Sequence, residues 1–395
     1  MNIELYIKYL THLLRCAVSD ERARDIPSEI DAKSFFEFCL YHKVENIAYY
    51  ALKYTDTSLI LAEIWSLFEE FSMHAITNDA TQQYYLELIE AELEKHEIDY
   101  LVLKGREIAK LYPSSDMRQS SDFDIYVGRE NAAKAKDIML DNGFTIVAYS
   151  DTDDCHDEYI IDRQVMCEMH RVLIQDDQPW QDECNRIPDR LILHKGTKHH
   201  YEMSTEDFYL YNLAHTAKHM KLSGIGVKAF LDLWIIYNRY KDSLDMSYLN
   251  EKLELCNLTE FDKNARALCR YWFEDEEPSE IVKRMSIYVA ESGWIGTAEQ
   301  MLSGQLAENA GKSNSKLAAK IKKCVGIIMS PYEDMAKRYP ILNRHKWLMP
   351  FCRLHRAFSA AIHKRELVRS ITDELDQGNM EMGKQILRFK KEIGL

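Results

Sequence analysis

The spacing of apolar residues changes twice along this chain of 395 residues, and the change limits the folds that it can adopt. In residues 1–97 the apolar side chains recur at helical spacing. Between residues 98 and 200, short runs alternate apolar and polar side chains, which is the pattern of half-buried strands. Helical spacing returns in residues 201–395. The sequence therefore predicts an α+β chain, in which a small mixed sheet at 98–200 is flanked by an N-terminal and a C-terminal helical region.

The central segment contains a glycine turn and two aspartates that suit a metal-dependent phosphate site. An apolar run at 100–103 predicts a buried strand, and Gly105 predicts a turn into a short helix. In the strand predicted at 122–127, Asp122 and Asp124 share one face and the apolar residues share the other. Burying two ionised carboxylates without a cation is costly, and Mg²⁺ prefers such oxygen ligands. Because free N–H groups at a helix start can hold phosphate oxygens, the stretch is typical of nucleotide transfer.

The same residues resemble the DNA polymerase beta-type nucleotidyltransferase superfamily, and more narrowly a bacterial branch of it. The motifs that carry the resemblance are Leu103-Lys104-Gly105, Tyr112-Pro113, Arg118 and Asp122-Phe123-Asp124-Ile125. The resemblance implies a nucleotidyltransferase core at 98–200 that uses Mg²⁺, or Mn²⁺ in its place, and a nucleoside triphosphate. The superfamily usually has Gly-Ser at the turn, whereas this chain has Gly105-Arg106. It therefore lacks the serine hydroxyl that, in the superfamily, commonly contacts a phosphate at this turn.

A two-metal transfer site needs a further carboxylate from a neighbouring strand. In the hairpin strand predicted at 165–174, Glu168 and His170 share one face, and Glu168 lies where the superfamily places its third acidic residue. Glu168 is therefore predicted to act with Asp122 and Asp124 as a catalytic residue and metal ligand, and a solvated strand edge is the alternative. His170 could orient Glu168 or contact a phosphate. The competing acidic residues nearby are Asp157, Glu158 and Asp162.

Several residues around the glycine turn and the aspartate strand are predicted to bind the nucleotide. They are Lys104, Gly105, Arg106, Arg118 and Ser121. Lys104 and the backbone at Gly105 would hold the β and γ phosphates, and the guanidinium of Arg118 suits phosphate oxygens near the two aspartates. The structural alternatives are that Lys104 is merely exposed and that Arg118 only pins the loop before the aspartate strand.

Two histidines and an aspartate of the C-terminal region are predicted to border the same cleft. His215 and His219 lie four positions apart on one predicted helix, a separation that brings two imidazoles together. No glutamate follows the first histidine, so the zinc-protease motif is absent. Asp232, on the next helix, could be a third metal ligand or a hydrogen-bond partner. The favoured interpretation is a polar pair at the junction of the helical and transferase regions.

The charge of the chain excludes one class of partner. A net charge of −14 argues against a protein that coats nucleic acid non-specifically, because such binding requires many phosphates to be neutralised. The charge is uneven, since residues 316–395 contain 17 Lys and Arg against 8 Asp and Glu, which leaves −23 for the first 315 residues. This basic part could attract an anionic acceptor or pack against the acidic body, and packing is favoured.

The remaining composition predicts a cytoplasmic protein without a membrane partner. No apolar run approaches the ~20 residues of a membrane span, and the N-terminus lacks the apolar centre of a signal peptide. The nine cysteines include no C-x-x-C pair, which favours reduced thiols over a disulfide framework or a zinc knuckle.

Three functional hypotheses follow from the residues and the resemblance. The leading one is transfer of a nucleoside monophosphate from a nucleoside triphosphate to an acceptor hydroxyl, with release of pyrophosphate. The second is a nucleotide-binding or regulatory protein that is catalytically weak or inactive. This hypothesis rests on the absence of a serine after Gly105 in the glycine turn. The third is transfer of the γ-phosphoryl group. The sequence leaves the acceptor open among small molecules, peptides, proteins and RNA ends.

Overall fold

The computed structural model describes residues 2–148, 155–294, 296–310, 349 and 380–395. Its contacts divide the chain into two compact units. The first consists of Met1–Met220, Ile225–Ile295 and Ile393–Leu395, and the second of Lys221–Gly224 and Gly296–Glu392. Most of the basic stretch noted from residue 316 onward lies outside the described residues. The boundaries at 97/98 and 200/201 stay a prediction.

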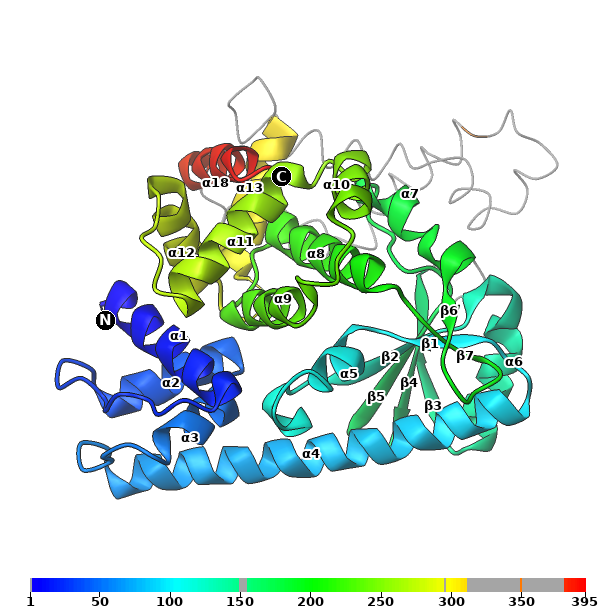
Figure 1. Cartoon of the computed structure of the whole chain (residues 1–395), viewed down its shortest axis with the longest axis horizontal. Coiled ribbons are helices and arrows are strands. Elements are labelled where there is room, and N and C mark those ends of the chain that lie inside the picture. The colour runs from blue at the N-terminus through cyan, green and yellow to red at the C-terminus, as the bar shows by residue number, and fades with distance from the viewer. Residues whose placement is uncertain (1, 149–154, 295, 311–348, 350–379) are drawn as a thin grey trace. The chain divides into compact units, whose positions relative to one another are not determined.

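Four helices precede the sheet, and the fourth is much longer than the others. They are α1 (Ile3–Ser19), α2 (Ala32–His42), α3 (Glu45–Leu52) and α4 (Ala62–Lys95). Asp31 begins α2, because its carboxylate accepts a hydrogen bond from the Ser34 amide at 2.8 Å and so satisfies a free donor of the first turn. Helix α4 has 34 residues and runs past both the other N-terminal helices and the sheet (Figure 1).

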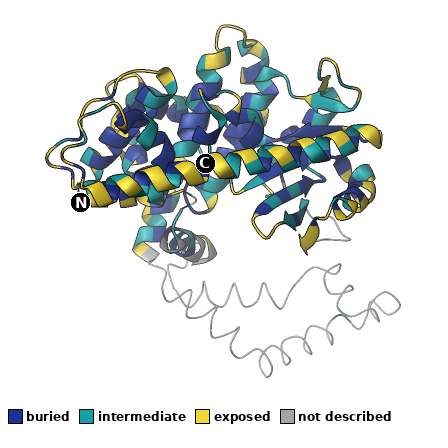
Figure 2. Cartoon of the chain, turned by 90° about the horizontal axis from the view of Figure 1, so that it is seen from below, coloured by how far each residue is buried: buried dark blue, intermediate teal, exposed yellow. Residues whose placement is uncertain are grey.

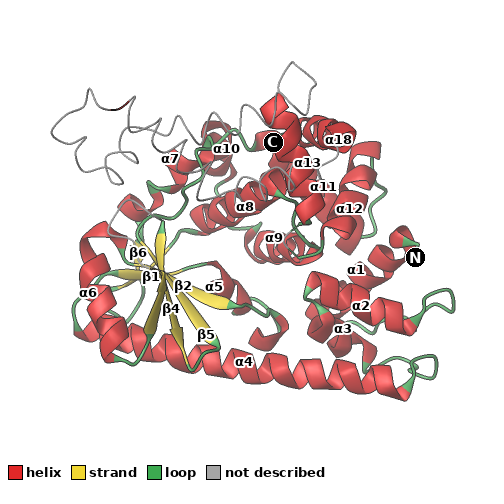
Figure 3. Cartoon of the chain, turned by 180° about the vertical axis from the view of Figure 1, so that it is seen from behind, coloured by secondary structure: helices red, strands yellow, loops and turns green. Residues whose placement is uncertain are grey.

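The central segment forms one sheet with short helices between its strands. Its elements are β1 (Tyr100–Val102), α5 (Lys104–Ala109), η1 (Ser115–Met117), β2 (Asp122–Tyr126), α6 (Gly128–Asp141), β3 (Thr145–Ala148), β4 (His156–Ile161), β5 (Val165–His170), α7 (Trp180–Cys184), η2 (Ile187–Arg190), β6 (Ile192–Leu193) and β7 (His200–Glu202). The strand order is β3-β4-β5-β2-β1-β7-β6. Figure 3 shows the strands together, with α4 running along one side of them and α6 beside them. Strand β2 runs parallel to β5 and antiparallel to β1. The sheet is therefore mixed, as predicted.

The apolar face of β2 packs into the core, and this leaves the opposite face for the aspartates. Phe123, Ile125 and Val127 are buried in one cluster with residues of α4 and α6. The helix residues of this cluster are Leu86, Ile89, Leu93, Ala135, Ile138 and Met139. The other side of α4 carries exposed residues (Figure 2). The alternation predicted for residues 122–127 is thus confirmed, because burial of the odd-numbered positions directs the even-numbered ones away from the core.

Helices again follow the sheet, which confirms the predicted fold class. In the order of the chain they are α8 (Thr205–Leu222), α9 (Val227–Tyr240), α10 (Met246–Leu255), α11 (Thr259–Phe273) and α12 (Glu280–Ser292). Helix α1 packs against α11 and α12, so N-terminal and C-terminal helices meet within the first unit. In the second unit α13 (Ala298–Ala310) packs against α18 (Met380–Glu392). Within the described ranges, no helix has both the length and the apolar character needed to cross a membrane.

Candidate active site

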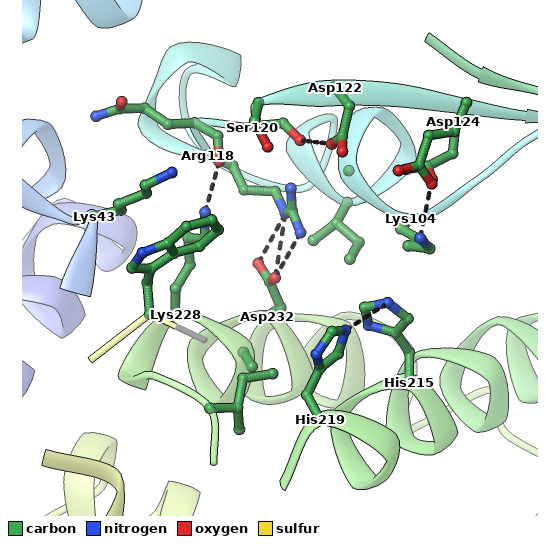
Figure 4. A pocket seen from close by; sticks show the side chains of 18 of the residues that line it. Lys43, Lys104, Arg118, Ser120, Asp122, Asp124, His215, His219, Lys228 and Asp232 are labelled. Atoms are coloured by element: carbon green, nitrogen blue, oxygen red, sulfur yellow. Dashed lines mark hydrogen bonds and ion pairs between the residues drawn. The ribbon is translucent and has the colours of Figure 1, made fainter. Parts of the chain in front are cut away.

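A cavity of about 980 Å³ lies in the first unit, between the polar face of β2 and β5 and the helices α8 and α9 (Figure 4). The aspartates of β2 lie on one side of it, and side chains of α8 and α9 lie on the other. All the predicted site residues except Arg106 line the cavity. They are Lys104, Gly105, Arg118, Ser121, Asp122, Asp124, Glu168, His170, His215, His219 and Asp232.

The strand register brings the carboxylates together. Asp124 on β2 is the direct partner of Glu168 on the parallel strand β5, and Asp122 is the partner of Met166. One oxygen each of Asp124 and Glu168 and one ring nitrogen of His170 lie within 4.8 Å of one another. Because strand residues two apart share a face, Asp122 projects to the same side as Asp124. The three predicted catalytic carboxylates therefore occupy one wall of the cavity.

Asp124 and Asp122 differ in how their charge is balanced. Lys104 Nζ donates a hydrogen bond to Asp124 Oδ1 at 2.9 Å, and His170 Nε2 lies 2.9 Å from the same oxygen. Burial alone would raise the pKa of Asp124, but these two cationic neighbours hold it well below its usual range. Burial raises the pKa of Asp122, and the charges of Asp124 and Glu168 raise it further. Lys104 and a hydrogen bond that the Ser120 hydroxyl donates to Asp122 Oδ1 at 3.1 Å offset only part of this rise.

His170 contacts two of the three carboxylates directly. Its Nε2 lies 3.3 Å from Glu168 Oε2 as well as 2.9 Å from Asp124 Oδ1. Burial would lower the pKa of His170, but hydrogen bonds with Asp124, Cys155 and Glu168 raise it to about 10. The imidazolium thus substitutes for part of the positive charge that a metal ion would bring.

Two of the competing acidic residues, Asp157 and Asp162, are directed elsewhere, whereas Glu158 projects from the same face as Glu168 and lies near it and His156. Asp157 is buried and accepts two hydrogen bonds from Arg171 Nη2, each at 2.7 Å. Asp162 lies in the turn between β4 and β5 and accepts a hydrogen bond from the Tyr85 hydroxyl. Glu158 is the partner of Glu168 across the antiparallel pair β4–β5 but does not line the cavity. Of these candidates, Glu168 alone lines the cavity beside the aspartates.

The glycine turn is open on the side of the cavity, but Arg106 points away from it. Arg106 Nη1 donates to Asp79 at 2.6 Å and Nη2 donates to Gln83, also at 2.6 Å, so α4 holds this buried guanidinium. A Cβ atom at Gly105 would lie 3.1 Å from Arg118 Nη1 and 3.2 Å from Ser120 Oγ. The structure therefore places the Ser120 hydroxyl next to the glycine turn, although Arg106 occupies the usual serine position.

A buried network explains why Tyr112, Arg118 and Asp232 occur together. Arg118 Nη2 donates to Asp232 Oδ2 at 2.9 Å, and its Nε lies 3.2 Å from both carboxylate oxygens. The Tyr112 hydroxyl donates to Asp232 Oδ1 at 2.7 Å. Asp232 is thus the partner of Arg118 rather than of the histidine pair. Arg118 is pinned by this contact and still lines the cavity.

His215 and His219 form a pair that faces Lys104 across the cavity (Figure 4). Their Nε2 atoms are 3.3 Å apart. Burial, Lys104 and the neighbouring histidine hold the pKa of His215 well below its ordinary value, and burial lowers that of His219 to about 4. Among the described residues, no group of three potential metal ligands includes either histidine. The pair is therefore a neutral polar surface of the cavity, as the favoured interpretation predicts.

Several residues of the cavity were not found by sequence reasoning. Lys228 on α9 donates to the Gln119 carbonyl at 2.7 Å, and burial together with Arg118 lowers its pKa to about 8. Lys43, just after α2, places Nζ 3.4 Å from the ring centroid of Trp294. Cys155 and His156 lie beside His170. No local sequence pattern joins these residues, because they come from three separate parts of the chain: the end of α2, the start of β4 and α9.

One of three comparisons with known proteins found a match, and the matched residues include the site. A family model described as an uncharacterised nucleotidyltransferase matches residues 28–274. No curated protein and no solved structure matches the chain. The matched range covers more than half of the chain and includes every residue that lines the cavity except Trp294.

Proposed function

The chain belongs to this nucleotidyltransferase family, and we propose that it transfers a nucleoside monophosphate from a nucleoside triphosphate to an acceptor hydroxyl. The transfer would release pyrophosphate and depend on Mg²⁺, or on Mn²⁺ in its place. The observation that supports this proposal is the convergence of Asp122, Asp124 and Glu168 on one wall of a cavity that is also lined by several cations. These cations are Lys43, Lys104, Arg118, Lys218 and Lys228.

The donor set fits a hard divalent cation. Asp122, Asp124 and Glu168 offer carboxylate oxygens, which Mg²⁺ and Mn²⁺ prefer as ligands. The raised pKa of Asp122 indicates that its negative charge is poorly compensated, so a cation beside it would be favoured. When bound, the metal would polarise the attacked phosphoryl group and help to hold the triphosphate.

The residues of the chain would align the two substrates for an in-line displacement. The acceptor oxygen attacks the α-phosphorus and forms a new P–O bond, while the bond from this phosphorus to the bridging oxygen of pyrophosphate breaks. Glu168 would accept the proton of the hydroxyl, because its carboxylate lies on the strand next to Asp124. Positioning and charge stabilisation would supply most of the catalysis, as they do in phosphoryl transfer generally.

The β and γ phosphates would lie between the glycine turn and α9. The backbone at Gly105 and the Ser120 hydroxyl form one side of this space, since Ser120 Oγ would be 3.2 Å from a Cβ at position 105. Arg118 lies on the same side, with Nη1 3.1 Å from that Cβ position, and Lys228 of α9 lies on the other side (Figure 4). Ser120 would thus supply the hydroxyl that the Gly105-Arg106 turn lacks.

A binding screen followed by a label experiment tests the proposal. Thermal shift with each of four nucleoside triphosphates, with and without Mg²⁺, identifies the preferred nucleotide. That nucleotide, labelled at the α or the γ phosphorus, is then incubated with the protein and with fractions of a cell extract as acceptors. The expected result is α-label on an acceptor and γ-label in pyrophosphate, both lost in Asp122→Asn. Label transferred from the γ position would instead show phosphoryl transfer and overturn the proposal.

A second candidate is a nucleotide-binding protein without transferase activity. It is favoured by the contacts of Asp124, whose Oδ1 is already shared by Lys104 and His170. It is also favoured by Arg106, which is committed to Asp79 and Gln83 rather than to a phosphate. Mg²⁺-dependent binding of a triphosphate without release of pyrophosphate, in the presence of all acceptor fractions, would decide for this candidate.

A further inference from the structure

A thiol and two imidazoles meet at the edge of the cavity beside the carboxylates. Cys155, His156 and His170 each offer one ligand atom, and these three atoms lie within 4.8 Å of one another. All three residues line the cavity. The transfer mechanism proposed above gives no role to Cys155 or His156, so the cluster calls for a separate explanation.

The sheet register places the two histidines side by side. His156 begins β4 and is the direct partner of His170 on the antiparallel strand β5. Directly opposed residues of such a pair project from the same face, and the two ring centroids are 5.0 Å apart. Nδ1 of His156 is buried and has no hydrogen-bond partner within the described part of the chain. A buried ring nitrogen without a partner is available to a ligand.

The position of Cys155 is fixed by the backbone of the neighbouring strand end. Its carbonyl accepts hydrogen bonds from the amides of Arg171 at 2.8 Å and Val172 at 3.4 Å. Its Sγ lies 3.8 Å from His170 Nδ1. Zn–S and Zn–N bonds of ~2.3 and ~2.0 Å place the sulfur and nitrogen ligands of a tetrahedral ion roughly 3.6 Å apart. The two atoms therefore need to move only slightly to bind one ion.

We propose that Cys155, His156 and His170 bind a thiophilic divalent ion such as Zn²⁺, at a site distinct from the carboxylates that would hold Mg²⁺. Thiolate and imidazole are the ligands that Zn²⁺ prefers, whereas Mg²⁺ prefers oxygen. Three protein ligands leave a fourth position that water or a molecule in the cavity can fill.

Asp124 links the zinc site to the proposed transfer site. His170 Nε2 lies 2.9 Å from Asp124 Oδ1, so a ring that binds the ion through Nδ1 donates to this carboxylate from Nε2. Such carboxylate–imidazole–metal chains orient the ring and strengthen its bond to the metal. The bound ion keeps His170 in this orientation and thereby holds Asp124 toward the cavity.

Metal titration of the full-length protein tests the proposal. After treatment with a chelator, the protein is titrated with Zn²⁺ against a competing chromophoric chelator, and with Co²⁺ to record thiolate-to-cobalt absorption. The test variants are Cys155→Ser and His156→Gln. All proteins carry Cys324→Ser and Cys352→Ser, so that these two thiols, which lie outside the described ranges, contribute no signal. The expected result is one Zn²⁺ per chain and a loss of at least ~10-fold in affinity in each variant.

Matched controls separate this site from its neighbours. His74→Gln removes an exposed histidine that lines the same cavity, and Asp122→Asn removes an oxygen ligand of the proposed Mg²⁺ site. Both should keep the Zn²⁺ affinity and the thiolate absorption, which Cys155→Ser should lose. Absence of stoichiometric Zn²⁺ binding, or binding that survives Cys155→Ser and fails in Asp122→Asn, would overturn the proposal. Neither result would affect the label experiment above, which is carried out with Mg²⁺.

Discussion

Asp124 and Glu168 are direct partners on the parallel strands β2 and β5, and one ring nitrogen of His170 contacts both carboxylates. The distance between the two acids is therefore set by the sheet itself rather than by a loop. A slip of one residue in the pairing would turn Glu168 into the core and Cys167 into the cavity. The core residues on either side of Glu168, which are fully buried, prevent this slip.

Asp122→Asn and Asp124→Asn should act alike on nucleotide binding and differently on stability. Both remove a charge from the proposed metal site, so Mg²⁺-dependent stabilisation by a triphosphate should be lost. In metal-free buffer, Asp122→Asn relieves a poorly compensated charge, and the free energy of unfolding should stay equal or rise. Asp124→Asn leaves the buried Lys104 without its anion and His170 with Glu168 alone, which should lower the free energy of unfolding by ~3 kcal/mol.

Urea unfolding monitored by circular dichroism measures this difference. Glu158→Gln serves as the matched control, because Glu158 lies opposite Glu168 but does not line the cavity. It should change neither stability nor nucleotide binding appreciably. Equal losses of stability in the two aspartate variants would contradict the charge distribution described for this site.

Arg118 and Asp232 should show strong coupling in a double-mutant cycle. Their side chains are only 11% and 8% exposed, so Arg118→Ala or Asp232→Ala each leaves a charge buried without its partner. Each single variant should lose ~3 kcal/mol of unfolding free energy, and the double variant clearly less than the sum of the two. The exposed pair of Arg270 and Glu276 is a suitable control, with an expected coupling below ~1 kcal/mol. A similar coupling in both pairs would mean that the Arg118 network adds little to stability.

Ser120→Ala should weaken triphosphate binding, whereas Ser121→Ala should have little effect. Ser120 Oγ lies beside the glycine turn, and a hydrogen bond from a hydroxyl to a charged phosphate contributes ~1.5 kcal/mol, or roughly tenfold in affinity. Ser121 is the matched comparison, because it was also predicted to bind the nucleotide and lines the cavity, but it is exposed and is not among the atoms nearest the glycine turn. Arg106→Ser, which introduces the serine that is usual in the superfamily that the sequence resembles, should lower stability by breaking the contacts with Asp79 and Gln83.

Isothermal titration with the preferred triphosphate and Mg²⁺ gives these affinities. Tighter nucleotide binding in Arg106→Ser than in the wild type would show that the turn itself, and not Ser120, is the main site of phosphate contact. A larger loss in Ser121→Ala than in Ser120→Ala would lead to the same conclusion.

Lys228 should make stability rise with pH in the alkaline range. Its pKa is lowered to about 8 from the ordinary 10.5 by burial and by Arg118, with Lys43 adding to the effect and Asp232 and Glu45 opposing it. Between these two values the unfolded chain binds more protons than the folded chain, so the free energy of unfolding increases with pH. The slope is at most ~1.4 kcal/mol per pH unit for one proton. Lys228→Met should remove this contribution.

The measurement compares urea unfolding of the wild type and Lys228→Met at several pH values from about 7 to about 10. Affinity for a triphosphate should fall over the same range in the wild type, because neutral Lys228 no longer attracts phosphate, and should vary less in the variant. Parallel stability curves for the two proteins would show that Lys228 keeps an ordinary pKa.

The parts of the fold that follow a local periodicity could be predicted from the sequence. The strand at Asp122–Tyr126 was predicted within one residue, because polar and apolar side chains alternate along it in the sequence. The hairpin that carries Glu168 was also predicted, although its second strand, expected at 165–174, ends at His170. Its turn at Asp162 and Arg163 adopts positive φ angles of 54° and 59°. Strands β6 and β7 were missed, since two or three residues are too few to display a period.

The partners of individual side chains could not be predicted. Arg106 follows the glycine turn and was expected at a phosphate, but α4 offers Asp79 and Gln83 at hydrogen-bond distance. Asp232 was considered with the histidines, yet it pairs with Arg118 across more than a hundred residues of sequence. These long-range pairings of side chains depend on how the helices pack on the sheet, so a local sequence pattern does not predict them.

Helix α4 makes the catalytic region inseparable from what precedes it. Asn78 and Gln82 donate to the Ser120 carbonyl at 3.2 and 3.0 Å, and Leu86, farther along, packs under the sheet. A fragment that begins at Ile98 would lose both amide donors and uncover the apolar underside of its strands, so it should aggregate. A fragment of this region that folds on its own should therefore include α4 and begin no later than Ala62.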